Sequence, residues 1–263
     1  MALIALASAK GSPGVTTAAL LLGGLWPRPV LLAECDPAGS DVALRIPAPD
    51  GNPLDTHDGL LGLVAAGRKK MHPELVLQHS QQIVGGLEVL TGVTVPEQAA
   101  GLGQQWGQLG PLFNEVEDHD VIADLGRIGA ATPQNALLGS AHAIVMVVDT
   151  VPSNVVHLRE RLGYVQAQVG GALGTPIHVL AVAEPRRTQA VRELRDALER
   201  AEVTVAGVHH VAYDVRGANV FQGQIKGNPR RTALVRSGIP VAQTLAETTA
   251  GFLRTPVEQE VAP

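Results

Sequence analysis

The feature that most constrains the fold is an alternation of short apolar runs with longer segments of helical character. The runs are four to eight residues long and are bounded by Gly, Pro or charged residues. They are mostly apolar throughout instead of alternating with polar residues, which is typical of strands buried on both faces of a sheet. The predicted strands are 2–8, 29–34, 87–91, 120–124, 143–149, 177–183 and 205–212.

Helical segments are predicted between these strands, with Ser153 as an N-cap and Pro133 in a first turn. Strands that alternate with helices imply right-handed crossovers and a parallel sheet with helices on both faces. The sequence therefore predicts an α/β fold, a three-layer sandwich around a mostly parallel twisted sheet. The predicted helices are 15–25, 96–115, 133–139, 153–169, 188–201 and 241–253.

Composition supports one large domain. The 263 residues are 45% hydrophobic but only 3% aromatic, so Ala, Val, Leu and Ile must build the core. The Pro-, Gly- and Asp-rich segment 45–58 is predicted to be an excursion after the second strand. We expect a single domain at 1–254 and a flexible C-terminal tail at 255–263.

Charge and cysteine content narrow the functional classes. The formal net charge of −5 argues against binding of nucleic acid or anionic membranes by bulk electrostatics. Two basic clusters, 68–70 and 226–236, are predicted to be solvated surface, with DNA binding as the less favoured alternative. Cys35 is the only cysteine, which excludes an intrachain disulfide, and the N-terminus lacks the pattern of a signal peptide. These features predict a cytoplasmic protein.

The first predicted strand leads directly into AKGSPGVTTAALLLGG, residues 9–24. A strand, a glycine-rich turn and a helix form the geometry in which backbone N–H groups bind a phosphate. Gly11 and Gly14 allow close approach, the Thr16 hydroxyl is placed to bind Mg²⁺, and Thr17 is placed to reach a phosphate oxygen. The alternative at this point is a glycine-rich turn that serves packing only.

This loop resembles the deviant Walker A motif of the MinD/ParA ATPases, K-G-G-x-G-K-[ST]. The residues that align with the motif are Lys10, Gly11, Ser12, Pro13, Gly14, Val15 and Thr16. The resemblance implies that Lys10 reaches across a nucleotide-bound dimer to the partner subunit's phosphates. Val15 replaces the usual P-loop lysine, and losing such a charge-stabilising donor costs on the order of 10²–10³ in rate.

Two further segments match the same family in the expected order. In PVLLAECDPAGSD, Asp36 matches the carboxylate that orients the attacking water, while Glu34 replaces the family's first Asp. In HDVIADLGRIG, Asp124 matches the Walker B acid that holds Mg²⁺ through a water. Near the C-terminus, Asp214 lies in a segment that borders the adenine in this family, although the usual proline before Tyr213 is absent.

The resemblance implies a dimerising switch that binds ATP and Mg²⁺ and organises a cellular machine through a protein partner. Its degenerate loop predicts slow or absent ATP hydrolysis and favours a divergent member of the TadZ/CpaE-like type. The alternatives are a scaffold on the same fold that binds no nucleotide and, less favoured, a metabolic or metal-delivery enzyme. The last predicted helix has no Lys or Arg before Arg254, so we expect no direct membrane anchor. The implied site residues are Lys10 and Asp36 for catalysis, Gly11, Ser12, Pro13, Gly14, Val15, Thr16, Thr17 and Asp214 for the nucleotide, and Thr16, Asp36 and Asp124 for the metal.

Overall fold

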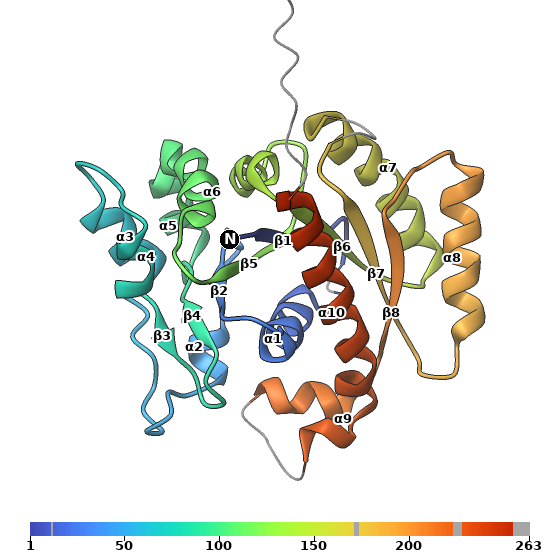
Figure 1. The fold of residues 1–263 in the computed structure, drawn as a ribbon, viewed down its shortest axis with the longest axis horizontal. Coiled ribbons are helices and arrows are strands. Elements are labelled where there is room, and N and C mark those ends of the chain that lie inside the picture. The colour runs from blue at the N-terminus through green and yellow to red at the C-terminus, as the bar shows by residue number, and fades with distance from the viewer. Residues whose placement is uncertain (12, 171–173, 223–227, 255–263) are drawn as a thin grey trace, which may run out of the picture.

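The computed structural model describes residues 1–11, 13–170, 174–222 and 228–254 (Figure 1). Ser12, Lys226 and the predicted tail 255–263 therefore lie outside the described residues. The strands are β1 (Leu3–Ser8), β2 (Val30–Glu34), β3 (Gln81–Gln82), β4 (Glu88–Leu90), β5 (Asp120–Arg127), β6 (Ala143–Asp149), β7 (Ile177–Ala183) and β8 (Gly207–Ala212). The helices are α1 (Val15–Leu25), α2 (Val42–Arg45), α3 (Leu60–Ala66), α4 (Glu74–Gln78), α5 (Pro96–Leu102), α6 (Trp106–Asn114), α7 (Pro152–Gln168), α8 (Thr188–Arg200), α9 (Val215–Ala218) and α10 (Ala233–Arg254), with short 3₁₀ helices that include Pro133–Ser140.

The strands form one eight-stranded sheet in the order β3-β4-β2-β5-β1-β6-β7-β8. Every neighbouring pair is parallel except β3 and β4. The carboxyl ends of the parallel strands consequently meet at one edge of the sheet, and β1 lies in the middle between β5 and β6. The predicted fold class, a three-layer α/β sandwich with a mostly parallel sheet, is confirmed.

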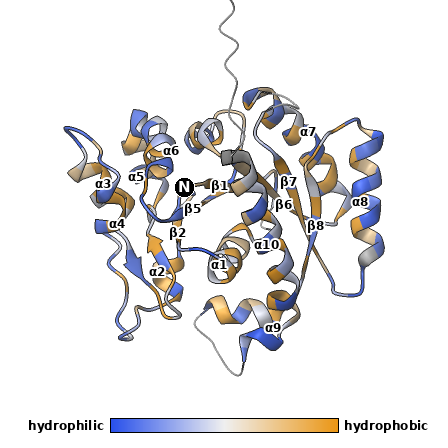
Figure 2. Cartoon of the chain, viewed as in Figure 1, coloured by the Kyte–Doolittle hydropathy of each residue, from blue (hydrophilic) through white to orange (hydrophobic). Residues whose placement is uncertain are grey.

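Two hydrophobic cores cover the two faces of the sheet. Leu3, Ala5 and Ala7 of β1 face a core completed by helices from α3 to α8, whereas Ile4 and Leu6 face a core completed mainly by α1 and α10. Hydrophobic residues follow the strands, while α8 presents a largely hydrophilic surface (Figure 2). Burial of alternate strand residues on opposite faces explains why the strand segments are apolar throughout.

Several elements differ from the sequence prediction. The predicted helix 96–115 is broken into α5, a 3₁₀ turn and α6, with Gly103 at φ +50° at the break. Helix α7 begins at Pro152 with Val151 at its N-cap, so Ser153 is not the cap. Helix α10 begins at Ala233 instead of 241 and continues through Pro240. The short elements β3, α2, α3, α4 and α9 were not predicted, because each offers too few residues to establish a period.

No helix within the described ranges is long and apolar enough to cross a membrane. The basic residues Arg68, Lys69 and Lys70 lie exposed after α3, and Arg230, Arg231 and Arg236 lie exposed at the start of α10 and just before it. Both groups are surface residues, as predicted. The remaining basic residue of the second cluster, Lys226, lies outside the residues that the structure describes.

A buried carboxylate holds the amino edge of the sheet together. Asp120, only 3% exposed, accepts hydrogen bonds from the backbone N–H of Ala2 (2.9 Å), Trp26 Nε1 (2.8 Å) and Arg28 Nε (2.8 Å). These partners come from the start of β1, the end of α1 and the approach to β2. Asp120 therefore ties three segments to the first residue of β5.

We predict that Asp120→Ala lowers the free energy of unfolding by about 3–5 kcal/mol, because it leaves buried N–H groups without an acceptor. Asp120→Asn should cost less, because its amide oxygen still accepts. Urea unfolding of both variants measures the effect, with the exposed Glu117→Ala as the matched control. A loss below 1 kcal/mol for Asp120→Ala would contradict the assigned role.

Candidate functional site

The glycine-rich loop joins β1 to α1 at the carboxyl edge of the sheet. Gly14 caps α1 with φ +89° and ψ +46°, a conformation that glycine adopts without a steric penalty. Its carbonyl accepts the N–H of Ala18 at 2.8 Å and so begins the helix. The amino end of α1 therefore lies at the loop, where its partial positive charge favours an anion. Ser12, which the sequence assigns to the same loop, lies outside the described residues.

Val15 is the first residue of α1, and its side chain is 7% exposed and belongs to the core between the sheet and α1 and α10. It contributes apolar packing at the position where a P-loop lysine would supply positive charge. The loop thus provides backbone N–H groups and hydroxyls, and its cationic side chain is Lys10.

Thr16 and Asp124 connect the loop to β5. The Thr16 hydroxyl hydrogen bonds to the carboxylate of Asp124, which also accepts the N–H of Gly126 at 3.0 Å. Asp124 is 2% exposed, and burial raises its pKa to about 6, against the opposing effect of these two hydrogen bonds. The sequence placed both residues at a metal site, and the structure brings them into direct contact.

Asp36 reaches across the end of β5 from the loop after β2. A Cβ atom added to Gly126 would lie 1.9 Å from Asp36 Oδ2, and Gly126 has φ +58°, so a side chain at this position would displace the carboxylate. Asp36 Oδ1 accepts the N–H of Ala38 at 2.8 Å, and burial raises the pKa of Asp36. Asp36 and Asp124 therefore both lie next to Gly126.

Glu34 is buried beside this pair. It lies opposite Asp124 in the register of β2 and β5 and is 2% exposed. Its two oxygens accept the N–H groups of Val42 (3.2 Å) and Gly92 (3.3 Å). Burial, and secondarily the charge of Asp124, raises the pKa of Glu34 to about 8, so it holds a proton at neutral pH.

A pocket of about 290 Å³ opens on the α1 side of the loop. Its wall includes Pro13, Gly14 and Thr17 of the loop region, together with Tyr213 and Asp214 after β8. The rest of the lining is mainly apolar, from Ala18, Val182, Val211, Ala212, Val215, Ala218 and Leu234, with Asn219 and Gln222 as polar groups. A largely apolar pocket with a few polar groups is typical of small-molecule sites.

Asp214 lines this pocket, but its carboxylate is engaged by the protein. It accepts the N–H groups of Gly217 (3.1 Å), Ala233 (2.8 Å) and Leu234 (3.4 Å), which lie at the starts of α9 and α10. Burial raises the pKa of Asp214, but the hydrogen bonds outweigh it and the pKa is lowered overall. Asp214 thus positions both helices around the pocket in addition to lining it.

Lys10 lies on the other side of the loop, where its Nζ is 3.0 Å from Nε2 of His157 in α7. One turn earlier in α7, Asn154 Nδ2 would lie 3.8 Å from a Cβ added to Gly11. Asn154 is itself held by Asp149 Oδ1 at 2.7 Å. The sequence did not single out Asn154 or His157, because only the packing of α7 brings them to the loop.

The oxygen donors of Thr16, Asp36 and Asp124 are of the kind that Mg²⁺ prefers. Within the described ranges, no group of three or more His, Cys, Asp or Glu residues could hold a metal ion unaided. Mg²⁺ usually completes its coordination with phosphate oxygens and water. The donors therefore fit a magnesium ion that binds together with a phosphate ligand.

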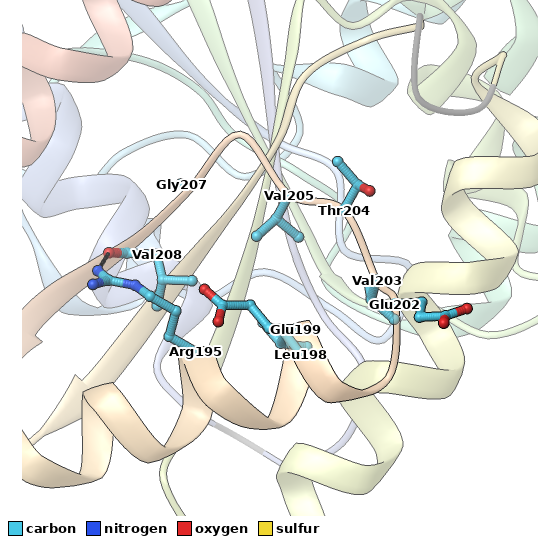
Figure 3. Close-up of a pocket in the computed structure, with 9 residues that line it drawn as sticks. All are labelled: Arg195, Leu198, Glu199, Glu202, Val203, Thr204, Val205, Gly207 and Val208. Carbon is cyan, nitrogen blue, oxygen red and sulfur yellow. Dashed lines mark hydrogen bonds between the residues drawn. The ribbon is translucent and has the colours of Figure 1, made fainter.

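A larger cavity, of about 450 Å³, lies between α8 and the start of β8 (Figure 3). Leu198, Val203 and Val205 line it, and Arg195 donates to the carbonyl of Val208 at 3.4 Å. It lies at the amino end of β8, whereas the loop follows the carboxyl end of β1, and ligands of open α/β sheets bind at the carboxyl edge. We therefore place the candidate site at the loop, despite the greater size of this cavity.

The raised pKa of Glu34 predicts a pH dependence of stability. Between the ordinary value of 4.5 and about 8, the folded chain binds more protons at Glu34 than the unfolded chain does. The free energy of unfolding must then fall as pH rises through this range. Glu34→Gln, which cannot ionise, should flatten the fall, most clearly between pH 6 and 8, because Asp124, with a pKa of about 6, adds its own fall below that range.

Urea unfolding from pH 5 to 8.5, without nucleotide or magnesium, measures these slopes. The exposed Glu117→Gln is the control and should keep the wild-type slope. Equal slopes for Glu34→Gln and wild type would show that Glu34 is ionised in the folded protein at neutral pH.

The sequence matches no protein-family model and no curated protein. Solved structures, by contrast, match over nearly the whole chain. A ParA family ATPase from Chlorobium tepidum TLS superposes with a TM-score of 0.69 at 14% identity, covering 92% of this chain and 98% of that one. MinD from Pyrococcus horikoshii OT3, complexed with Mg-ADP, gives a TM-score of 0.65 at 16% identity, covering 97% and 99%.

A MinC:MinD cell division protein complex from Aquifex aeolicus gives a TM-score of 0.60 at 15% identity, covering 98% of this chain and 97% of that one. Each of these likenesses extends over the full sheet and its helices. At such low identity they establish the architecture and leave function to be argued from the site. The chain has the fold of the MinD and ParA P-loop proteins.

Proposed function

We propose that this chain is a MinD/ParA-like switch that binds ATP with Mg²⁺ and hydrolyses it slowly or not at all. The observation that supports this most directly is the Thr16–Asp124 hydrogen bond beside a glycine-rich loop that opens on a 290 Å³ pocket. A packing turn needs neither a buried acid bonded to a loop hydroxyl nor an open pocket beside it. We propose further that residues 1–254 act as a single nucleotide-binding domain in the cytoplasm.

Each residue of the site has a distinct role in this proposal. The backbone of Gly11, Pro13, Gly14 and Val15 would surround the phosphates, and Thr17 would contact a phosphate oxygen. Thr16, Asp36 and Asp124 would hold Mg²⁺, and Asp36 would also orient a water toward the terminal phosphate. Mg²⁺ would neutralise charge on the phosphates as the bond breaks. Asp214 holds the wall of the base pocket, and Lys10 supplies a cation.

Slow turnover follows from Val15. Phosphoryl transfer depends on positioned positive charge around the phosphates, and a buried valine side chain supplies none. Binding depends less on that lysine, because the loop backbone, the amino end of α1 and the metal each contribute. The site is therefore better suited to holding a nucleotide than to cleaving it.

The proposed output is a nucleotide-dependent homodimer that recruits a protein partner and organises a cellular machine. The likeness to a MinC:MinD complex supports a fold that can present a partner-binding surface, and the likeness to a Mg-ADP complex supports nucleotide binding. Within this class, the degenerate loop favours the TadZ/CpaE-like type, which serves pilus and secretion assembly. DNA binding is the less favoured output, and we propose no direct membrane anchor.

One observation favours a second candidate, a scaffold that binds no nucleotide. It is that the side chains of the loop and pocket already have protein partners: Val15 packs into the core, Asp214 accepts three backbone N–H groups, and Lys10 contacts His157. These contacts would also stabilise a site that has lost its ligand. Nucleotide binding distinguishes the two candidates directly.

We predict that millimolar ATP-Mg²⁺ raises the melting temperature of the wild-type chain by about 5–10 °C, as a ligand at roughly 100-fold its Kd should for a domain of this size. Lys10→Ala should lose most of this shift, because it removes the loop's cation. Thermal unfolding with and without nucleotide is the measurement, and the exposed Lys69→Ala is the matched control.

The absence of any shift in the wild type would favour the scaffold. A shift of equal size in wild type and Lys10→Ala would support nucleotide binding but remove Lys10 from the site.

We predict that Val15→Lys tightens ATP binding and raises turnover, by up to about 10² if the new amine reaches the phosphates. The same change should lower the stability of the nucleotide-free chain by about 1–3 kcal/mol, because it replaces a buried valine. ATP titration, phosphate release and urea unfolding measure the three effects. Val15→Met, which is unbranched and uncharged, should lack the gains, and no gain in Val15→Lys relative to it would count against a working phosphate site.

A further inference from the structure

A second pocket lies against the opposite side of the phosphate-binding loop. It has a volume of about 250 Å³ and is lined by Ala9, Lys10, Arg127, His157, Glu160 and Arg161. Lys10 belongs to both the loop and the pocket, so a group bound in the pocket would touch the loop at its beginning. We refer to these residues as the cationic pocket.

Three elements build the cationic pocket, and each is positioned by the sheet. Arg127 is the last residue of β5 and lies opposite Ser8 of β1 in the strand register. Ser8 is followed in the chain by Ala9 and Lys10, so Arg127 lies next to the start of the loop. Helix α7 contributes His157, Glu160 and Arg161 from one stripe, since residues three and four apart lie on the same face of a helix. Asn154, next to Gly11, lies on this stripe one turn earlier. The stripe therefore runs along the loop.

The pocket gathers positive charge that the protein does not neutralise. It contains three permanent cations, Lys10, Arg127 and Arg161, against the single carboxylate of Glu160. Throughout the described part of the chain, no ion pair joins any of these four charges to an opposite one. Lys10 instead contacts a histidine nitrogen at 3.0 Å, and the Arg161 guanidinium lies 5.2 Å from the ring centre of Tyr164.

The group is cationic in a chain whose formal net charge is −5. A polyvalent anion would satisfy it. Guanidinium groups bind phosphate oxygens through paired hydrogen bonds and keep their charge at every physiological pH. The phosphate loop, in turn, lacks the cation that Val15 replaces.

We propose that Arg127 and Arg161, together with Lys10, bind the terminal phosphate of a nucleoside triphosphate and thereby replace the charge lost at Val15. This inference rests on the proposed nucleotide binding and adds to it a preference for a triphosphate over a diphosphate. The phosphate can come from the nucleotide on the chain's own loop or from the nucleotide of a second copy that faces it. Its chemistry is the same in both cases.

The Lys10–His157 contact gives the pocket a resting arrangement. Lys10 Nζ lies 3.0 Å from His157 Nε2 in the absence of phosphate, and this contact holds the amine inside the pocket. A terminal phosphate offers the same amine an acceptor of opposite charge, which an imidazole nitrogen does not provide. Lys10 therefore exchanges its contact with His157 for a contact with the phosphate, and its side chain stays within the pocket.

The test is to measure Kd for ATP-Mg²⁺ and for ADP-Mg²⁺ separately, by calorimetric titration of wild type, Arg127→Ala and Arg161→Ala. Each variant should bind ATP about tenfold or more weakly while its Kd for ADP stays within about twofold of wild type, because only ATP carries the third phosphate. Arg127→Lys, which keeps the charge, should recover part of the loss. Arg159→Ala is the matched control, since Arg159 is exposed on the same helix and does not line the pocket.

The outcomes separate this proposal from the one on which it rests. Wild-type binding of both nucleotides, with ATP and ADP weakened equally or not at all in the arginine variants, would overturn this inference alone. Failure of the wild type to bind either nucleotide would overturn both. Retained ADP binding shows that the variants are folded.

The same titrations identify the source of the phosphate when repeated at protein concentrations that differ 100-fold. A preference for ATP that grows with protein concentration assigns the phosphate to a second copy's nucleotide. A preference that does not change assigns it to the chain's own loop. Either result supports the cationic pocket as the site of the terminal phosphate.

Discussion

The contact between Thr16 and Asp124 joins the two parts of the molecule on which every other feature of the site depends. Thr16 belongs to the first turn of α1, which packs on one face of the sheet, and Asp124 belongs to β5, next to β1 within the sheet. Their hydrogen bond links the first turn of α1 to the sheet edge. The parallel strands β1, β2 and β5 all end at this edge. Glu34 at the end of β2 and Asp36 just after it therefore lie beside Thr16 and Asp124.

Burying carboxylates at this edge of the sheet is electrostatically unfavourable. The cost is reduced because Glu34 is protonated and because backbone N–H groups donate hydrogen bonds to Glu34 and Asp124. Glu34 and Asp124 are neighbours in register, and both are almost completely buried, so two full negative charges here would be strongly unfavourable. The raised pKa of Glu34 leaves Asp124 as the carboxylate available to a metal. Glutamate at position 34 thus fits the site as a neutral hydrogen-bonding group, in place of the family's aspartate.

Much of the fold was predictable because its signal is local. Mostly apolar runs identified seven of the eight strands. The Gly-rich loop, Asp36 and Asp124 each follow or end a strand, and a parallel sheet brings the carboxyl ends of its strands to one edge. Strand β3 was missed because Gln81 and Gln82 carry no apolar pattern, and α10 was placed too late because Pro240 resembles a helix boundary. In each case tertiary packing outweighed local propensity.

The cationic pocket could not be predicted from the sequence, because its residues are far apart in the chain. Nothing in the sequence spacing relates Arg127 to Arg161, and only the fold brings the end of β5 and α7 to one pocket. The loss of a lysine at Val15 was visible as a defect in a motif, but the charges that stand near the loop come from other elements and match no motif. If the cationic pocket binds phosphate as proposed, a positively charged environment for phosphate persists while the residues of the loop motif change. For this reason the absence of a family match for this chain says little about whether its loop still holds a ligand.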